Sequence, residues 1–273
     1  MKNQAEVFTF VVDVGNTHTV LAIYAGEKIV DHWRLTTRKE TTSDEVMNRV
    51  GGLIRFSQIN TEEISYVGLS TVVPVLERPW IKALQKLLKK PVQVVSSKNC
   101  LDCPIAYANP ASLGADRLCN VIALKNRGLQ NAIVIDMGTA TTFDVLYQGG
   151  FAGGLIIPGI SASMDVLTEK AARLTPVSIE WPARVVANNT DDAIRAGLLF
   201  GFIAELEALV FKIKSELGKE DMPVFATGGW GRMILGHTKI IGTYDPYLTV
   251  DGVRLVAIWG NRAEKIDRDS DEV

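Results

Sequence analysis

Two short turns in the sequence carry the residue types that hold phosphate groups and a metal ion. The first lies in residues 10–24, FVVDVGNTHTVLAIY, where Asp13 closes an apolar, strand-like run and Gly-Asn-Thr follows after one residue. Burying an unpaired carboxylate costs free energy, so an acid at this place needs a partner such as a cation. A glycine after a strand lets backbone N–H groups approach a ligand closely, and amides, Asn and Thr suit phosphate oxygens. We therefore expect Asp13 to hold a cation, or its water shell, beside bound phosphates.

The second turn repeats the first in the other half of the chain. Asp136 ends the run AIVIDMG at 132–138, and after each Asp-x-Gly come a second strand, a short turn and a third strand. A repeated unit of this size is typical of an internally duplicated protein. An aspartate in a turn often does no more than cap it, and that interpretation stays open for either turn alone. Two such turns in matching three-strand units favour a clamp for a triphosphate and its metal, with one turn from each half.

A candidate for acid–base chemistry lies in NPASLGADRLCNVIAL, residues 109–124. Apolar residues recur at helical spacing from Leu118 onward, which predicts a helix that starts near Ser112 with Asp116 in its first turn. The helix dipole alone favours an acid there, and this alternative also stays open. The adjacent Arg117, however, can hold a carboxylate through two parallel hydrogen bonds. An aspartate beside such a clamp is suited to take the proton from a hydroxyl that attacks a phosphate.

The composition and the remaining motifs argue against several other kinds of site. Neither the P-loop pattern G-x-x-x-x-G-K-[ST] nor a G-x-G-x-x-G after a strand occurs in the sequence. The 29 basic and 31 acidic residues give a net charge of −2 without a basic run, which makes nucleic acid an unexpected partner. Cys100 and Cys103 form a C-x-x-C, but only Cys119 remains as a further thiol. A loop with two small residues is therefore preferred over a zinc or redox site.

The elements that position these residues alternate between strands and helices, which is typical of an α/β protein with parallel pairing. Thr42 and Glu45 form a capping box at the start of a helix over 42–58. Thr190 is expected to be the N-cap of a long helix that ends near Gly218. The other expected elements are strands at 65–74, 91–95 and 222–229, and helices at 77–90 and from about Asp251.

Length and hydropathy place the chain among soluble globular proteins. The 273 residues suffice for about two domains, and the hydrophobic fraction of 47% and charged fraction of 22% are ordinary for such proteins. No apolar run reaches the roughly 18 residues of a membrane span. The first residues, MKNQAEVFTFVVD, lack the basic region and cleavage site of a signal peptide. We therefore expect a cytoplasmic protein that does not associate with membranes.

The chain resembles the type III pantothenate kinases, which belong to the acetate kinase, sugar kinase, Hsp70 and actin superfamily. The motifs that carry the resemblance are DVGNT (13–17), STVVP (70–74), GADR (114–117), IDMGTATTFDV (135–145), GGLIIPG (153–159), TGG (227–229) and DPYLTVDGV (245–253). One of these motifs alone would be weak, but the ordered set spans nearly the whole chain and is specific.

The resemblance implies two ribonuclease-H-like, actin-like domains with mixed sheets flanked by helices. We place a boundary within 108–130 and assign 1–115 to the first domain and 116–273 to the second. The C-terminal helix is expected to be able to pack back onto the first domain. The acidic end, residues 267–273, lies outside the family pattern and is expected to be disordered.

The resemblance also implies an activity, the ATP-dependent phosphorylation of pantothenate to 4'-phosphopantothenate in coenzyme A synthesis, and roles for particular residues. Asp116 matches the family's general base, and Asp136 matches the ligand of a monovalent cation, K⁺ or NH₄⁺. From its place at the turn, Asp13 is expected to reach Mg²⁺ through water. The positions that match ATP-binding residues are Asp13, Val14, Gly15, Asn16, Thr17, His18, Thr19, Val20, Gly138, Thr139, Gly228 and Gly229. Those that match pantothenate-binding residues are Tyr107, Gly114, Ala115, Asp116, Arg117 and Thr190.

The family resemblance further implies a homodimer in which the partner completes the substrate pocket. Two other functions remain open from the residues alone. One is a kinase of the same superfamily for another small alcohol or acid. The other is a nucleotide-switched binding or regulatory protein of the actin or Hsp70 type, which would hydrolyse ATP slowly without an acceptor.

Overall fold

The chain divides into two units, which are described in turn. A computed structural model describes residues 7–100, 103–171 and 173–271, with side chains as far as Asn261. The first unit contains 1–129, 149–151 and 247–273, and the second contains 130–148 and 152–246. The division therefore falls after Leu129, within the expected boundary region but beyond the expected 115/116 border, because the helix that begins at Ala115 packs in the first unit. Of the tail expected to be disordered, 272–273 lie outside the described residues, and the backbone of 267–271 continues a helix.

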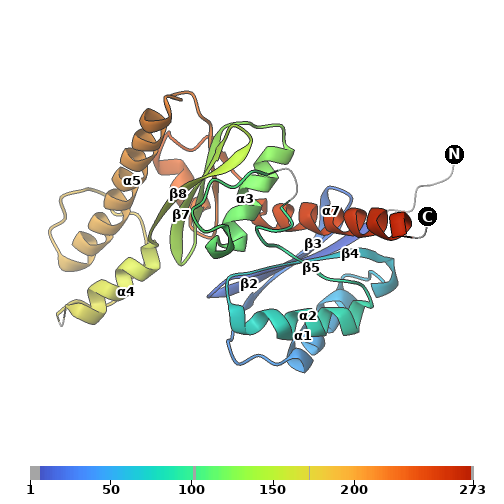
Figure 1. The fold of residues 1–273 in the computed structure, drawn as a ribbon. Helices are drawn as coiled ribbons and strands as arrows, with labels where there is room; N and C mark the ends of the chain where they lie inside the picture. The colour runs from blue at the N-terminus through green and yellow to red at the C-terminus, as the bar shows by residue number, and fades with distance from the viewer. Residues whose placement is uncertain (1–6, 101–102, 172, 272–273) are drawn as a thin grey trace. The chain divides into compact units, whose positions relative to one another are not determined.

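Each unit contains a sheet with flanking helices (Figure 1). Both sheets are mixed and five-stranded, and they share one strand order. In the first unit the order is β3-β2-β1-β4-β5, and in the second it is β8-β7-β6-β9-β10 when read in the same direction. The first sheet contains β1 (Phe8–Val14), β2 (His18–Ala25), β3 (Lys28–Thr36), β4 (Ile64–Thr71) and β5 (Gln93–Val94). The second contains β6 (Ala132–Met137), β7 (Ala140–Tyr147), β8 (Gly150–Pro158), β9 (Val224–Thr227) and β10 (Thr243–Tyr244). The predicted α/β class and the internal duplication are thereby confirmed.

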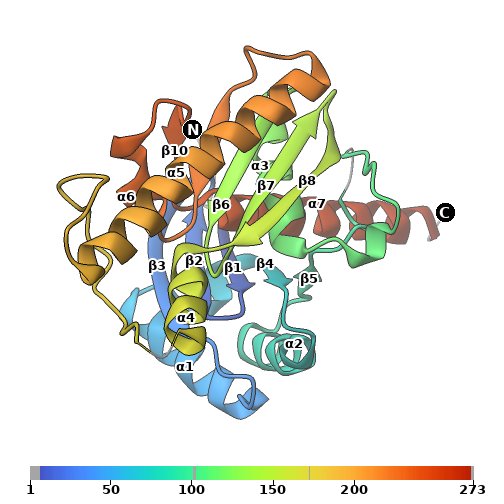
Figure 2. The same cartoon turned by 90° about the vertical axis from the view of Figure 1, so that its left-hand side faces the viewer.

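Helices cover both faces of the first sheet. On one face lie α1 (Ser43–Phe56) and α2 (Pro74–Leu88), and on the other lies α7 (Leu248–Asp271), as Figure 2 shows. Alternate residues of β1 and β2 pack into the core under α1 and α2, because successive side chains of a strand point to opposite faces. The predicted capping box is present at the start of α1, where Thr42 and Glu45 bond to each other's backbone amides.

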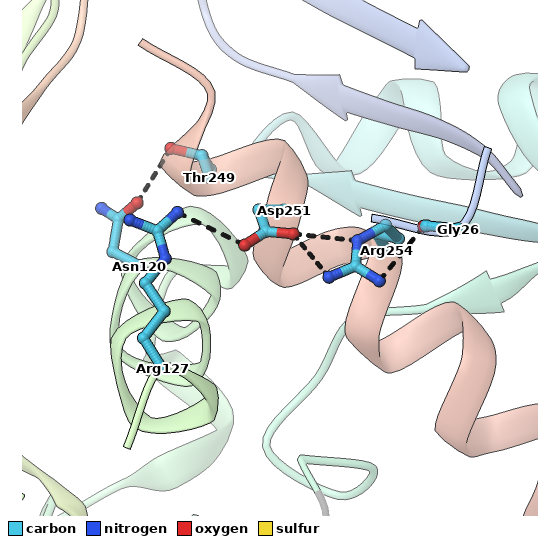
Figure 3. Close-up of polar contacts among 6 residues, drawn as sticks. All are labelled: Gly26, Asn120, Arg127, Thr249, Asp251 and Arg254. Carbon is cyan, nitrogen blue, oxygen red and sulfur yellow. Dashed lines mark hydrogen bonds and ion pairs between the residues drawn. The ribbon is translucent and has the colours of Figure 1, made fainter. Parts of the chain in front are cut away.

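The helix α3 (Ala115–Asn126) is held against α7 within the first unit by polar contacts at its middle and just after its C-terminal end (Figure 3). Thr249 Oγ1 donates to Asn120 Oδ1 at 2.8 Å, and Arg127 Nη2 lies 3.4 Å from a carboxylate oxygen of Asp251. The other oxygen of Asp251 accepts from Arg254, whose Nη2 lies 2.8 Å away. These contacts fix the orientation of the helix that carries Asp116.

Next to these polar contacts the two helices approach so closely that only a glycine fits at position 252. A Cβ atom there would overlap the backbone carbonyl of Cys119 on α3. We expect Gly252→Ala to lower the free energy of unfolding by roughly 1–3 kcal/mol, because two backbones would have to separate. Chemical denaturation monitored by circular dichroism measures this change.

Gly52→Ala is the matched control, since Gly52 also lies inside a helix of the first unit but a Cβ there meets no atom within 4 Å. This variant should gain up to about 1 kcal/mol from helix propensity. A Gly252→Ala variant as stable as the control would contradict the close helix contact.

In the second unit, α5 (Thr190–Leu217) supplies most of the helical side chains that pack against the sheet. The prediction that Thr190 caps this helix was wrong by one residue. Asn189 is the N-cap, because its Oδ1 accepts the amide of Asp192 at 2.9 Å. The elements not predicted from the sequence are β10, α4 (Ile160–Lys170), α6 (Gly231–Ile234) and the 3₁₀ turns Thr61–Glu63, Pro110–Ser112 and Leu235–His237.

Candidate active site

The predicted ATP-binding residues of the first unit form the end of the β1–β2 hairpin. Gly15 N–H donates to the carbonyl of His18 at 3.0 Å, and a Cβ on Gly15 would lie only 2.9 Å from that oxygen. Asn16 and Thr17 are exposed at the tip, whereas Val14 and Thr19 are buried in the adjoining strands. The tight turn therefore presents polar groups and backbone to solvent from a rigid pair of strands.

Asp13 lies half-buried at the end of β1, and its carboxylate oxygen Oδ1 is fully buried without a hydrogen-bond partner. Desolvation, and secondly the charge of Asp116, raise its pKa from the ordinary 3.8 to about 7. On β4, the fully buried Ser70 pairs in register with Asp13. Ser70 Oγ lies near enough to oppose part of the rise, although it makes no hydrogen bond within 3.5 Å. A buried carboxylate oxygen without a donor is suited to receive a cation or a water bound to one.

Asp116 occupies the first turn of α3, which begins at Ala115 after a separate 3₁₀ turn rather than near Ser112 as expected. Its Oδ1 accepts the backbone amide of Arg117 at 2.7 Å. Burial raises the pKa of Asp116, and this amide together with the Arg117 guanidinium opposes the rise. The result is a carboxylate that is more basic than usual, as a general base requires.

Gly114 is needed where it stands, immediately before Asp116. A Cβ at Gly114 would lie 2.5 Å from Asp116 Oδ1. Gly114 also occupies the N-cap position of α3 without a side-chain cap, and Ala115 behind it is buried. The glycine of the GADR motif thus lets the carboxylate turn back toward the start of the helix.

The predicted substrate residues Arg117 and Tyr107 are linked through Phe151, which is fully buried. The Arg117 guanidinium lies over the Phe151 ring at 5.6 Å from its centroid, and the Tyr107 ring meets the same ring edge-on at 6.0 Å. Backbone hydrogen bonds of 2.8 Å to Pro104 and Ala106 hold Phe151 in the first unit. The charge of Arg117, which is 5% exposed, is therefore fixed in position by an aromatic ring.

The predicted residues of the second unit meet around the β6–β7 turn. Gly138 N–H donates to the carbonyl of Ala140 at 3.1 Å, much as Gly15 does in the first unit, and Gly159 N–H donates to the carbonyl of Thr139 at 3.2 Å. A Cβ at Gly159 would overlap the carbonyls of both Gly138 and Thr139. Close backbone packing therefore fixes the shape of this second turn.

Gly228 lies directly beside Asp136, because β9 runs parallel to β6 with Thr227 opposite that aspartate. Its φ of +84° is in the region that favours glycine, and a Cβ there would lie 2.5 Å from Asp136 Oδ1. Tyr244 Oη donates to the carbonyl of Gly228 at 3.1 Å, and Gly229 beyond it is exposed. The glycine pair thus brings backbone, rather than side chains, next to the carboxylate of Asp136.

Thr190, the remaining predicted substrate residue, is the first residue of α5 and is exposed. The loop before it is anchored by Arg195, whose Nε donates to the carbonyl of Ser178 at 2.9 Å. Among the predicted residues of the second unit, Thr190 has no described contact with the group around Asp136.

The cysteine pair behaves as two structural residues. Cys100 and Cys103 are free and buried, and the Cys100 thiol donates to the carbonyl of Ser97 at 3.3 Å. Burial raises the pKa of both thiols, which lowers their reactivity at neutral pH. Over the described ranges, His, Cys, Asp and Glu side chains nowhere gather in a group of three able to hold a metal. Every helix within the same ranges is too short or too polar to cross a lipid bilayer.

Three residues near the predicted ones were missed by the reading of the sequence. Ser70 pairs in register with Asp13, Cys119 is fully buried on α3, and Phe151 supports Arg117. The carboxylates of Asp13 and Asp116, after burial, raise the pKa of the Cys119 thiol. Ser70 lies on the predicted strand at 65–74, but only the register of that strand puts it opposite Asp13, and Phe151 has no local signal either.

A family model described as type III pantothenate kinase matches residues 9–212. Among curated proteins, the type III pantothenate kinase of Desulfosudis oleivorans is 37% identical over 256 residues, which cover 93% of this chain and 99% of the relative. The enzyme of the same name from Syntrophotalea carbinolica is 38% identical over 251 residues, which cover 90% of this chain and 96% of the relative.

Solved structures show the same fold at low identity. A conserved putative Baf family transcriptional activator from Campylobacter jejuni superposes with a TM-score of 0.60 at 18% identity, over 93% of this chain and 99% of that one. A ROK hexokinase from Thermus thermophilus superposes with a TM-score of 0.50 at 14% identity, over 94% of this chain and all of that one. At this identity the likeness concerns the fold alone, which is that of the actin-like sugar kinases.

Proposed function

The chain belongs to the type III pantothenate kinase family, and we propose that it phosphorylates pantothenate with ATP, with Asp116 as the general base. The product is 4'-phosphopantothenate, and the reaction is the first step of coenzyme A synthesis. The family match over most of the chain is the observation that carries this function.

Asp116 takes the proton from the primary hydroxyl of pantothenate as that oxygen attacks the γ-phosphate of ATP. Burial makes Asp116 more basic than a surface carboxylate, and its hydrogen bond from the Arg117 amide fixes the direction of the carboxylate. The reaction needs positioning and charge neutralisation rather than a covalent enzyme intermediate. An oriented base of raised pKa fits this need.

Arg117 binds the carboxylate of pantothenate. Its guanidinium is nearly buried and held by the Phe151 ring, so little side-chain entropy is lost when it pairs with an anion. Tyr107, Gly114, Ala115 and Thr190 contribute the remaining contacts to the substrate. The Tyr107 ring, which packs on the same Phe151, supports this assignment for the residues of the first unit.

The two glycine turns bind the nucleotide. The hairpin from Asp13 to Val20 offers backbone amides and the polar side chains of Asn16 and Thr17 to the phosphates. Gly138, Thr139, Gly228 and Gly229 supply the corresponding backbone in the second unit. An ATP-dependent kinase uses a divalent ion such as Mg²⁺, which neutralises phosphate charge when bound. Asp13 would hold Mg²⁺ through water, and its unpartnered Oδ1 fits this role.

Asp136 holds a monovalent cation, K⁺ or NH₄⁺. Its carboxylate lies against the backbone of Gly228, at the end of two parallel strands. Hard cations prefer oxygen ligands of this kind. The ion would supply positive charge near the phosphate turn of the second unit.

A homodimer in the cytoplasm is the proposed state of the protein. The second unit exposes large apolar side chains on β8, α4 and α5, namely Ile156, Val166 and Phe211, which are 62%, 57% and 64% exposed. Exposed apolar side chains of this size are typical of a protein interface when they cluster. Light scattering after size-exclusion chromatography measures the mass in solution.

We expect ADP release to depend on pantothenate when the protein is supplied with ATP, Mg²⁺ and K⁺. A coupled assay for ADP, run with and without pantothenate, measures this dependence, and mass spectrometry identifies the phosphorylated product. Replacing K⁺ by Na⁺ in the same assay tests the monovalent ion.

The same assay separates the two alternatives that the residues left open. ADP release that is slow and indifferent to any acceptor would indicate a nucleotide-switched binding protein. ADP release that depends on another small alcohol or acid, but not on pantothenate, would indicate a kinase of the same superfamily with a different substrate. Either outcome would overturn the proposed substrate.

A further inference from the structure

Arg34 lies beside the phosphate turn of the first unit without an acidic partner. Its Nη2 is 3.4 Å from Nδ1 of His18, the residue that ends the turn. Because a guanidinium can only donate, Nδ1 of His18 is the acceptor in this contact. Arg34 is exposed, and no carboxylate whose side chain the structure describes forms an ion pair with it. An arginine held at the turn by a neutral imidazole keeps its positive charge available to an anion.

The strand register places Arg34 in one row with Asp13. Val20 on β2 pairs with Asp13 on one side and with Arg34 on the other. Residues that pair in register point to the same face of a sheet, so all three side chains leave the face opposite α1 and α2. Neighbouring strands are about 4.8 Å apart, which places the Cα atoms of Asp13 and Arg34 roughly 10 Å from each other. That distance suits two groups that contact opposite sides of one chain of phosphates.

A cation is the component that the predicted nucleotide site otherwise lacks. The residues assigned to ATP contain neither lysine nor arginine, and Asp13 adds a negative charge among them. Arg117 is assigned to the carboxylate of the other substrate. Enzymes that transfer phosphoryl groups recurrently place a lysine or arginine at the β- and γ-phosphates, because charge on the equatorial oxygens must be stabilised. Magnesium alone leaves the nucleotide anionic.

We propose that Arg34 binds the terminal phosphates of the nucleotide, from the strand next to the phosphate turn. The proposal rests on the proposed function only in taking the ligand to be a nucleoside triphosphate. In this arrangement the guanidinium donates to the β- or γ-phosphate oxygens, while His18 and the β2–β3 pairing hold the side chain over the turn. Arg34 then contributes to ground-state binding and to the stabilisation of charge during transfer.

The test compares Arg34→Gln with the wild type in calorimetric titrations with Mg·ATP, Mg·ADP and AMP. Loss of a charge-assisted contact should weaken Mg·ATP binding by roughly 10- to 100-fold. AMP has no terminal phosphates, so its affinity should stay within about twofold. Arg34→Lys should recover part of the lost affinity, because the ammonium group keeps the positive charge but cannot donate two parallel hydrogen bonds as a guanidinium can. In the kinase assay, the KM for ATP should rise while the KM for pantothenate stays constant.

Lys28→Gln is the control for the loss of one positive charge, because Lys28 is exposed at the other end of the same strand. It removes an equal charge about 20 Å from Arg34, at six residues of strand rise. An equal loss of Mg·ATP affinity in the control would show that the effect comes from the overall charge of the protein and not from a contact of Arg34. That outcome would overturn the proposal. Equal weakening of ATP and AMP by Arg34→Gln would overturn it as well. The calorimetric titration needs no acceptor substrate. If ADP release by the wild type did not depend on pantothenate, the proposed substrate would be refuted, but the titration would still test the role of Arg34.

Discussion

Replacing Asp116 with asparagine should lower kcat for pantothenate phosphorylation by roughly 10²- to 10⁴-fold, the usual contribution of a general base. Asparagine has nearly the same shape, and its Oδ1 can still accept the Arg117 amide that Asp116 accepts at 2.7 Å. The start of α3 should therefore keep its structure. An amide cannot take a proton from the hydroxyl at neutral pH, so turnover should be lost while ATP still binds.

Steady-state kinetics and ATP titration of the purified variant measure the two effects separately. Asp44→Asn is a suitable control, because Asp44 also lies in the first turn of a helix of the first unit but its side chain is 80% exposed. The control should retain wild-type kcat. Near-normal turnover of Asp116→Asn would remove Asp116 from the role of base.

The pH profile gives a second signature of this base. Burial raises the pKa of Asp116, and only its ionised form can accept the proton. The value of kcat should therefore decline as the pH falls through this raised pKa, at a higher pH than for a surface aspartate. A profile that is flat down to pH 4 would indicate that no carboxylate of raised pKa takes part.

Replacing Asp13 with asparagine should stabilise the metal-free protein at pH 8 while weakening its binding of Mg·ATP. The folded state raises the pKa of Asp13 to about 7 from 3.8, so the folded protein binds a proton more tightly than the unfolded chain. Protonated Asp13 therefore favours the folded state at low pH. This contribution to the free energy of unfolding is lost as the pH rises through 7 and the carboxylate ionises. At pH 8 the ionised, buried Asp13 should cost roughly 3–5 kcal/mol.

Asparagine carries no charge, so the variant should escape this cost. In EDTA at pH 8 its Tm should exceed that of the wild type by roughly 5–10 °C. The difference should shrink steadily toward pH 4, where Asp13 is protonated in the folded state. Added Mg·ATP should stabilise the wild type more than the variant, since a ligand stabilises the state that binds it.

Differential scanning calorimetry across pH 4–8, with and without Mg·ATP, measures all of these shifts. The exposed Asp44→Asn again serves as the control for loss of one carboxylate. A variant with the same Tm as the wild type at pH 8 would contradict the buried, unpartnered state of Asp13. The expected gain in stability at the expense of nucleotide binding is typical of residues kept for function.

The features that could be predicted from the sequence are those with local causes. The capping box of Thr42 and Glu45 needs only four consecutive residues, and it is present. The two Asp-x-Gly hairpins pair neighbouring strands across short turns, so Asp13 and Asp136 could each be assigned to a strand end. The repeat of this pattern indicated the duplicated fold that the matching strand orders confirm.

The features that could not be predicted depend on contacts between distant segments. Ser70 lies beside Asp13 only because β4 runs parallel to β1 in one particular register. Phe151 supports Arg117 because Phe151, near the start of β8, forms an isolated parallel bridge with Ile105. The N-cap of α5 was misplaced for a simpler reason, since Asn189 and Thr190 are both good capping residues and only geometry chooses between them.

The close contact between Gly252 and Cys119 also sets an order of events during translation. The helix α3 leaves the ribosome well before α7, and the whole second unit is synthesised between them. A nascent chain folds as its units emerge, but a helix whose packing partner is missing has little to stabilise it. The segment that carries Asp116 and Arg117 is thus expected to become ordered only after Gly252 has been translated and α7 has docked.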